Sequence, residues 1–121
     1  MAAHNDLGHW GEDLAVSYLQ DKGYHILYRD WRYRHRDLDI IALKDDVLVI
    51  VEVKTRSNER FLDADRAVTP QKIRSISIAA NTFVKMYQVH AEIRFDIITI
   101  VGTPGGAVDI RHTESAFLPF I

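Results

Sequence analysis

The sequence predicts an α/β fold in which helices cover a central sheet, in the order helix, three antiparallel strands, helix, two further strands. Three observations lead to this prediction. Apolar residues near the N-terminus recur at the helical period up to Gly23, two apolar runs meet at a polar turn around 44–46, and Thr69-Pro70 opens a second helical pattern. The 121 residues suffice for a single domain, 1–121, with a real core.

The composition is that of a globular protein, with 47% hydrophobic and 26% charged residues. The absence of cysteine excludes disulfides and thiolate zinc sites. A net charge of -2 argues against coating nucleic acid by bulk charge, so any phosphate contact would be local. No apolar run is long enough to span a bilayer and the N-terminus lacks a signal-peptide pattern, so we expect a cytoplasmic protein without a membrane partner.

The first helix is expected from about Asp6 to Lys22. Its apolar stripe includes Ala15 and Leu19, and the helical period places Glu12 over the same stripe, pointing inward. This acid either complements the positive end of the helix dipole or belongs to a site, and both interpretations stay open.

An aromatic and basic strand is expected from Tyr24 to Arg34. Trp31 and Tyr33 would share one face, with Arg32 and Arg34 on the other. Arginine beside aromatic rings suits phosphate contact and base stacking, although the solvated face of a strand shows the same pattern.

Two further strands, Leu38 to Leu43 and Val47 to Lys54, are expected to form a hairpin. If the two consecutive aspartates form the turn, Asp39 lies directly opposite Glu52. A turn one residue earlier brings Asp37 opposite Glu52 instead. In both registers one face carries the same four charged residues, Asp37, Asp39, Glu52 and Lys54.

Facing carboxylates without cysteine favour a hard, oxygen-seeking cation, Mg²⁺ or Mn²⁺ before Zn²⁺. Lys54 would stand beside that metal, where an ammonium can orient a water or stabilise charge on a phosphate oxygen. The alternative is a structural salt bridge from Lys54 to Asp37 or Glu52.

A polar loop is expected from Thr55 to Val68, followed by a helix to about Tyr87. The expected buried stripe of this helix comprises Ile73, Ile76, Ala80, Phe83 and Tyr87. Lys72 and Arg74 lie in its first turn, where cations oppose the helix dipole. That placement makes sense beside an anionic ligand, although exposed cations cost little.

Strands are expected at Glu92 to Val101 and Ala107 to His112. Asp96 is expected to satisfy backbone or arginine groups rather than bind metal, and no role is assigned to the histidines. The apolar tail after Ala116 should pack either on the core or on a second subunit, and in the second case the protein would be a homodimer.

An acid, then Glu52-Val53-Lys54 on the next strand, with a glutamate on the preceding helix, resembles the PD-(D/E)XK nuclease superfamily. More closely, the chain resembles the YraN family of small endonuclease-like bacterial proteins, which is similar to archaeal Holliday junction resolvases. The family usually has Gly-Glu where this chain has Arg36-Asp37. The resemblance rests on Gly8, Gly11, Glu12, Ala15, Tyr18, Leu19, Gly23, Tyr24, Arg29, Trp31, Arg32, 37–39, 51–56, 67–70, Lys72, Phe95 and Asp96.

This resemblance implies a restriction-endonuclease-like three-layer core, a mixed central sheet flanked by helices. It implies metal ligation by Asp39, Glu52 and the carbonyl of Val53, with Lys54 at the water, Glu12 as an accessory acid, and Mg²⁺ or Mn²⁺ as cofactor. The implied function is a metal-dependent DNA endonuclease of resolvase type. The alternative is a nucleic-acid-binding module that keeps the fold without cutting. The candidate nucleic-acid contacts are Arg32, Arg34, Arg36, Arg56 and Lys72.

Overall fold

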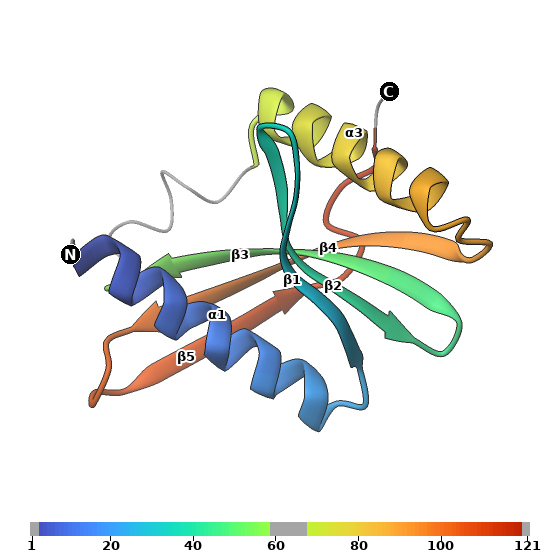
Figure 1. Ribbon diagram of the computed structural model, residues 1–121. Coiled ribbons are helices and arrows are strands. Elements are labelled where there is room, and N and C mark those ends of the chain that lie inside the picture. The colour runs from blue at the N-terminus through green and yellow to red at the C-terminus, as the bar shows by residue number, and fades with distance from the viewer. Residues whose placement is uncertain (1–2, 59–67, 120–121) are drawn as a thin grey trace.

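The computed structural model describes residues 3–58 and 68–119, with side chains from residue 7 onward (Figure 1). The predicted order of elements is confirmed. The elements are α1 (Ala3–Asp21), β1 (His25–Tyr33), β2 (Arg36–Lys44), β3 (Val47–Arg56), α3 (Pro70–Met86), β4 (Glu92–Gly102) and β5 (Val108–Thr113).

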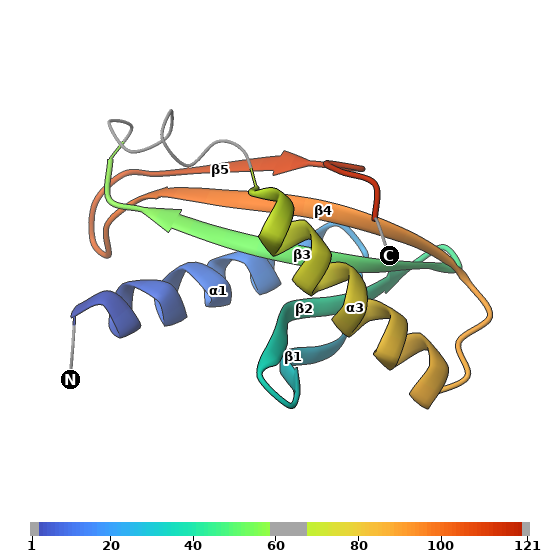
Figure 2. The same cartoon turned by 90° about the horizontal axis from the view of Figure 1, so that it is seen from above.

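The five strands form one sheet in the order β1-β2-β3-β4-β5. The pairing of β3 with β4 is parallel and the other pairings are antiparallel, so the sheet is mixed. Helix α1 packs on one face of the sheet and α3 on the other, each over its own apolar cluster (Figures 1 and 2). The predicted three-layer arrangement is therefore present.

Helix α1 ends where the sequence predicts. Gly23 adopts a left-handed conformation with φ of 89°, and the N–H groups of Gly23 and Tyr24 bond back to the carbonyls of Gln20 and Leu19. These bonds satisfy carbonyls that the last turn of a helix leaves without partners. The helix begins at Ala3 rather than near Asp6.

The hairpin of β2 and β3 adopts the first of the two expected registers. Asp45 and Asp46 are the turn residues, with φ values of 48° and 68°, and Lys44 pairs with Val47. Positive φ at both central positions matches the right-handed twist of the strands, and aspartate tolerates it better than most residues.

Three expectations need correction. Strand β3 continues through Arg56, so the loop expected from Thr55 begins later, and residues 59–67 lie outside the described part of the chain. Tyr87 is 46% exposed rather than buried, because α3 ends at Met86 and Tyr87 is its C-cap residue. Only part of the apolar tail packs on the core: the ring centroids of Phe117 and Phe95 lie 5.3 Å apart, whereas Leu118 is 84% exposed.

Within the described residues, no helix is long and apolar enough to cross a membrane.

The sheet splits at one end. The ladder between β2 and β3 stops at the pair Ile40–Val51, whereas β3 and β4 stay paired to Arg56. The β1–β2 hairpin continues on its own to its turn after Tyr33 (Figure 1). We call this place, where β2 leaves β3, the fork.

Candidate metal and nucleic-acid site

Asp39 is the first residue of the fork. It lies directly beyond the last ladder pair of β2 and β3, and its Oδ2 accepts a hydrogen bond of 2.8 Å from the backbone N–H of Val53. A side chain thus replaces the carbonyl that a continued ladder would have offered to this N–H. The structure shows a bond between Asp39 and the backbone N–H of Val53. Metal ligation by the carbonyl of Val53 stays a proposal.

Acids from three neighbouring strands meet at the fork. Glu52 follows Val51 on β3 and Asp39 precedes Ile40 on β2, so each acid lies one residue beyond the last ladder pair. On β1, Asp30 lies between residues that pair with Ile40 and Leu38, so it adjoins Asp39 across the strands. One carboxylate oxygen each from Asp30, Asp39 and Glu12 of α1 lie within 4.8 Å of one another. We call Glu12, Asp30, Asp39 and Glu52 the acid cluster.

Asp30 is the member that the sequence analysis missed. If residues 34 and 35 form a two-residue turn, Asp30 lies opposite Asp39, just as the turn at 45–46 places Asp39 opposite Glu52. The signal was therefore present in the chain. It is blurred by a bulge between Ile26 and Tyr28 and by the positive φ of 48° at Asp30.

Glu12 reaches the cluster because α1 lies unusually close to β3. A Cβ placed on Gly11 would overlap Oγ1 of Thr55, a contact that real atoms do not tolerate. Glycine at this position therefore lets the helix backbone rest directly on the strand. Glu12 is buried, which confirms the predicted inward direction of its side chain.

Asp39 and Glu52 form a half-buried pair of acids. Burial, followed by the negative charge of Asp39, raises the pKa of Glu52 from its ordinary 4.5 to about 8. Burial also raises the pKa of Asp39, although the bonds from Val53 and Glu52 oppose this. Two carboxyl groups in contact hold a proton between them unless a cation replaces it.

Glu12 has a similar environment on the α1 side. Burial and then the charge of Asp30 raise its pKa to about 7. Its Oε1 accepts bonds from the guanidinium of Arg29 at 3.3 and 3.2 Å, and Arg29 also binds Asp13 at 2.6 Å. Glu12 therefore already has a cationic partner in this chain.

Lys72 supplies the cation on the α3 side. Its Nζ lies 3.4 Å from Oε2 of Glu52. Although burial opposes it, the charges of Glu52, Asp39 and Asp37 raise the pKa of Lys72. The sequence suggested an external anion for this first-turn lysine, whereas the structure provides an internal one.

A pocket of about 410 Å³ opens on the α1 side of the fork. Glu12, Asp30 and Asp39 lie in it with the candidate phosphate contacts Arg32 and Arg56. The lining residues are Leu7, Gly8, His9, Glu12, Asp30, Arg32, Asp39, Val53, Thr55 and Arg56. Glu52 and Lys54 are not among them. The sequence predicted Asp39, Glu52 and Lys54 on one face, whereas in the structure this pocket contains Asp39 with Val53 and Thr55, the residues that alternate with Glu52 and Lys54 along β3.

The remaining predicted contacts are more dispersed. The guanidinium of Arg34 lies 5.3 Å from the ring of Tyr33 at the end of the hairpin. Arg36 donates a 3.2 Å bond to Oγ of Ser75, which fixes its side chain to α3. Lys54 is half-buried on β3, opposite Thr99 of β4.

The donor set fits a hard divalent cation. Carboxylate oxygens are the ligands that Mg²⁺ and Mn²⁺ prefer, and the raised pKa values of Glu12, Asp39 and Glu52 mark carboxyl groups that keep a proton unless a cation takes its place. Asp39 adjoins both groups, so it could share a cation with Glu52 or with Glu12 and Asp30.

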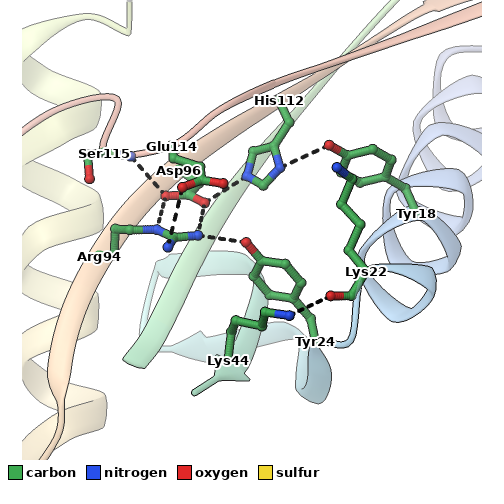
Figure 3. A network of polar contacts seen from close by, with 9 residues as sticks. All are labelled: Tyr18, Lys22, Tyr24, Lys44, Arg94, Asp96, His112, Glu114 and Ser115. Atoms are coloured by element: carbon green, nitrogen blue, oxygen red, sulfur yellow. Dashed lines mark hydrogen bonds and ion pairs between the residues drawn. The ribbon is translucent and has the colours of Figure 1, made fainter. Parts of the chain in front are cut away.

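A second buried polar network has a structural role (Figure 3). As predicted, Asp96 of β4 serves an arginine: its oxygens accept bonds of 2.9 and 2.8 Å from Arg94. His112 of β5, to which the sequence analysis gave no role, lies with Nε2 2.7 Å from Asp96 and Nδ1 3.2 Å from the hydroxyl of Tyr18. Arg94 also binds the hydroxyl of Tyr24 at 2.7 Å. The network therefore ties α1 to β4 and β5.

The mixed sheet with helices on both faces and the acid cluster define an α/β protein with a candidate metal-binding site. The chain belongs to the family described as uncharacterised protein family UPF0102, whose family model matches residues 11–100. It is similar to a UPF0102 protein of Bacteroides fragilis, with 51% identity over 119 residues and 98% of each chain covered.

Two further relatives have comparable likeness. A UPF0102 protein of Bacteroides thetaiotaomicron is 48% identical over 119 residues, covering 98% of each chain. One of Flavobacterium psychrophilum is 47% identical over 120 residues, covering 99% of this chain and 100% of that protein. These matches confirm the predicted membership of the YraN family, while neither the family description nor the names carry an activity.

Proposed function

We propose that this protein is a metal-dependent nuclease that hydrolyses phosphodiester bonds in DNA, in the manner of resolvases and other PD-(D/E)XK enzymes. The observation that carries the proposal is the contact between the half-buried acids Asp39 and Glu52 at the fork, beside a pocket with two arginines. A protein tolerates this arrangement at a cost in stability, and functional sites are where such costs are common.

Each residue has a chemical task in this proposal. Asp39 and Glu52, with the carbonyl of Val53, would hold Mg²⁺ or Mn²⁺. When bound, such a cation lowers the pKa of a water and stabilises charge on a phosphate oxygen. Lys54 would orient that water and Glu12 would act as an accessory acid. Support for Glu12 comes from its pKa of about 7, which suits proton transfer near neutral pH.

The proposed substrate contacts surround these acids. Arg32 and Arg56 line the same pocket as Asp39, so they would bind backbone phosphates next to the reacting one. Arg34 and Arg36 lie on and beyond the β1–β2 turn and would contact phosphates further along. Lys72 would contribute once its ion pair with Glu52 is released.

The test is cleavage of branched, single-stranded and duplex DNA in Mg²⁺ and in Mn²⁺. Glu52→Ala and Lys54→Ala should abolish cleavage, while Glu92→Ala and Lys85→Ala, which change exposed residues of the same types, should leave it unchanged. Cleavage that persists undiminished in the first two variants would refute the proposal.

A non-cutting nucleic-acid-binding module is the second candidate. It is favoured by the position of Lys54, which lies outside the pocket that holds Asp39 and the two arginines. Calorimetry with millimolar Mg²⁺ and Mn²⁺ separates the two candidates. DNA binding without any metal binding would favour the module.

A further inference from the structure

The first turn of α3 carries a cation where a helix does not favour one. The N-terminal end of a helix is positive, so a lysine there costs free energy unless an anion lies close. Lys72 has such an anion, because its Nζ lies 3.4 Å from Oε2 of Glu52. Thr69 caps the same turn by accepting a bond from the backbone N–H of Lys72. The helix end is thus fixed in the position from which the lysine reaches the acids.

Both ends of the acid cluster are compensated by cations of this chain. Arg29 binds Glu12 on the α1 side, and Lys72 binds Glu52 on the α3 side. A divalent cation held by Asp39 and Glu52 would have to approach the oxygen that Lys72 contacts. Two cations at one carboxylate repel strongly where solvent is largely excluded, and the side chain of Glu52 is only 13% exposed.

We propose that Lys72 is the internal counter-ion of the Asp39–Glu52 pair and yields this place to a divalent cation, so that its ammonium binds a nucleic-acid phosphate only in the metal-bound protein. This inference rests on the proposed function. The side chain of Lys72 is 44% exposed, and its flexible stem lets the ammonium turn outward without movement of α3. Metal and nucleic acid are then positively coupled through one residue.

The test measures oligonucleotide affinity at one fixed pH, with and without Ca²⁺, which takes the same oxygen ligands. Without Ca²⁺, Lys72→Met and Lys72→Gln should bind the oligonucleotide within twofold of the unmodified protein. With saturating Ca²⁺ they should bind about fivefold more weakly, and the slope of log affinity against log salt should be smaller by about one. A gel confirms that the oligonucleotide stays intact.

Arg74 provides the matched control, since it is another exposed cation in the same turn. Any effect of Arg74→Met should be equal with and without Ca²⁺. By reciprocity, the oligonucleotide should raise Ca²⁺ affinity in the unmodified protein more than in the two Lys72 variants.

The outcomes separate this inference from the proposed function. Equal losses in both conditions would mean that Lys72 always contacts phosphate, and no loss in either would mean that it never does. Each result overturns the inference while leaving a metal-dependent nuclease intact. Failure of the unmodified protein to bind any divalent cation in calorimetry would overturn both.

Discussion

Replacement of Glu52 by glutamine should make the metal-free protein less sensitive to alkaline pH. The native pKa of Glu52, about 8, lies above its ordinary value of 4.5. The folded protein therefore binds this proton more tightly than the unfolded chain does. The contribution of Glu52 to the free energy of unfolding is fully present below about pH 4.5, and it is lost progressively as the pH rises toward 8.

The size of the effect follows from the same two values. Between pH 6 and pH 8.5, ionisation of Glu52 should lower the free energy of unfolding by about 2–3 kcal/mol. Glu12, with a pKa of about 7, should add about 1 kcal/mol over the same range. Glu52→Gln should remove the larger part of this slope and keep the smaller, because glutamine retains hydrogen bonding to Asp39 without the charge.

Urea denaturation followed by circular dichroism at several pH values measures this slope, in a metal-free buffer containing a chelator. Glu92→Gln is the control, because Glu92 is exposed at the start of β4 and should follow the unmodified protein. A slope in Glu52→Gln equal to that of the unmodified protein would refute the reasoning, since the charge at the fork would then carry no penalty.

Three more predictions concern other parts of the structure. Gly11→Ala should lower the free energy of unfolding by about 1–3 kcal/mol in urea denaturation, whereas Gly8→Ala, whose Cβ meets nothing within 4 Å, should raise it by about 0.5–1 kcal/mol. Asp96→Asn should cost about 3–5 kcal/mol in the same assay, and Asp109→Asn, in an exposed pair of the same spacing, under about 1 kcal/mol. Mg²⁺ binding at pH 7 should release about one proton from Glu52, seen by calorimetry in buffers of different ionisation enthalpy and absent in Glu52→Gln.

The sequence predicted the hairpin at the fork because the rules involved are local. Two consecutive aspartates tolerate the positive φ values of the turn, and strand alternation then leaves two registers, in which Glu52 faces either Asp39 or Asp37. Asp39 and Glu52 could therefore be brought together without knowledge of the remaining chain. The order of elements followed similarly from helix caps and apolar runs.

Long-range partners could not be predicted in this way. The ion pair of Lys72 with Glu52 joins residues on different elements, and its formation depends on how α3 lies over the sheet. Nothing near Lys72 in the chain distinguishes an internal anion from a bound phosphate. The Asp96 network likewise requires His112 from a different strand. Asp30 is an intermediate case, because its pairing followed from a turn but a bulge and an unusual φ obscured it.

The fork explains why the acids are tolerated and also why they are accessible. If β2 and β3 stayed paired past Val51, a carbonyl would satisfy the N–H of Val53 and the carboxylate of Asp39 would have no backbone partner there. The split frees that N–H for Asp39 and opens the pocket beside it. The remaining charge is balanced inside the protein by Arg29 and Lys72. In the proposed mechanism, an acid pair with its own counter-ion folds without metal and would then exchange that counter-ion for a metal, which a pair built only for stability would not need to do.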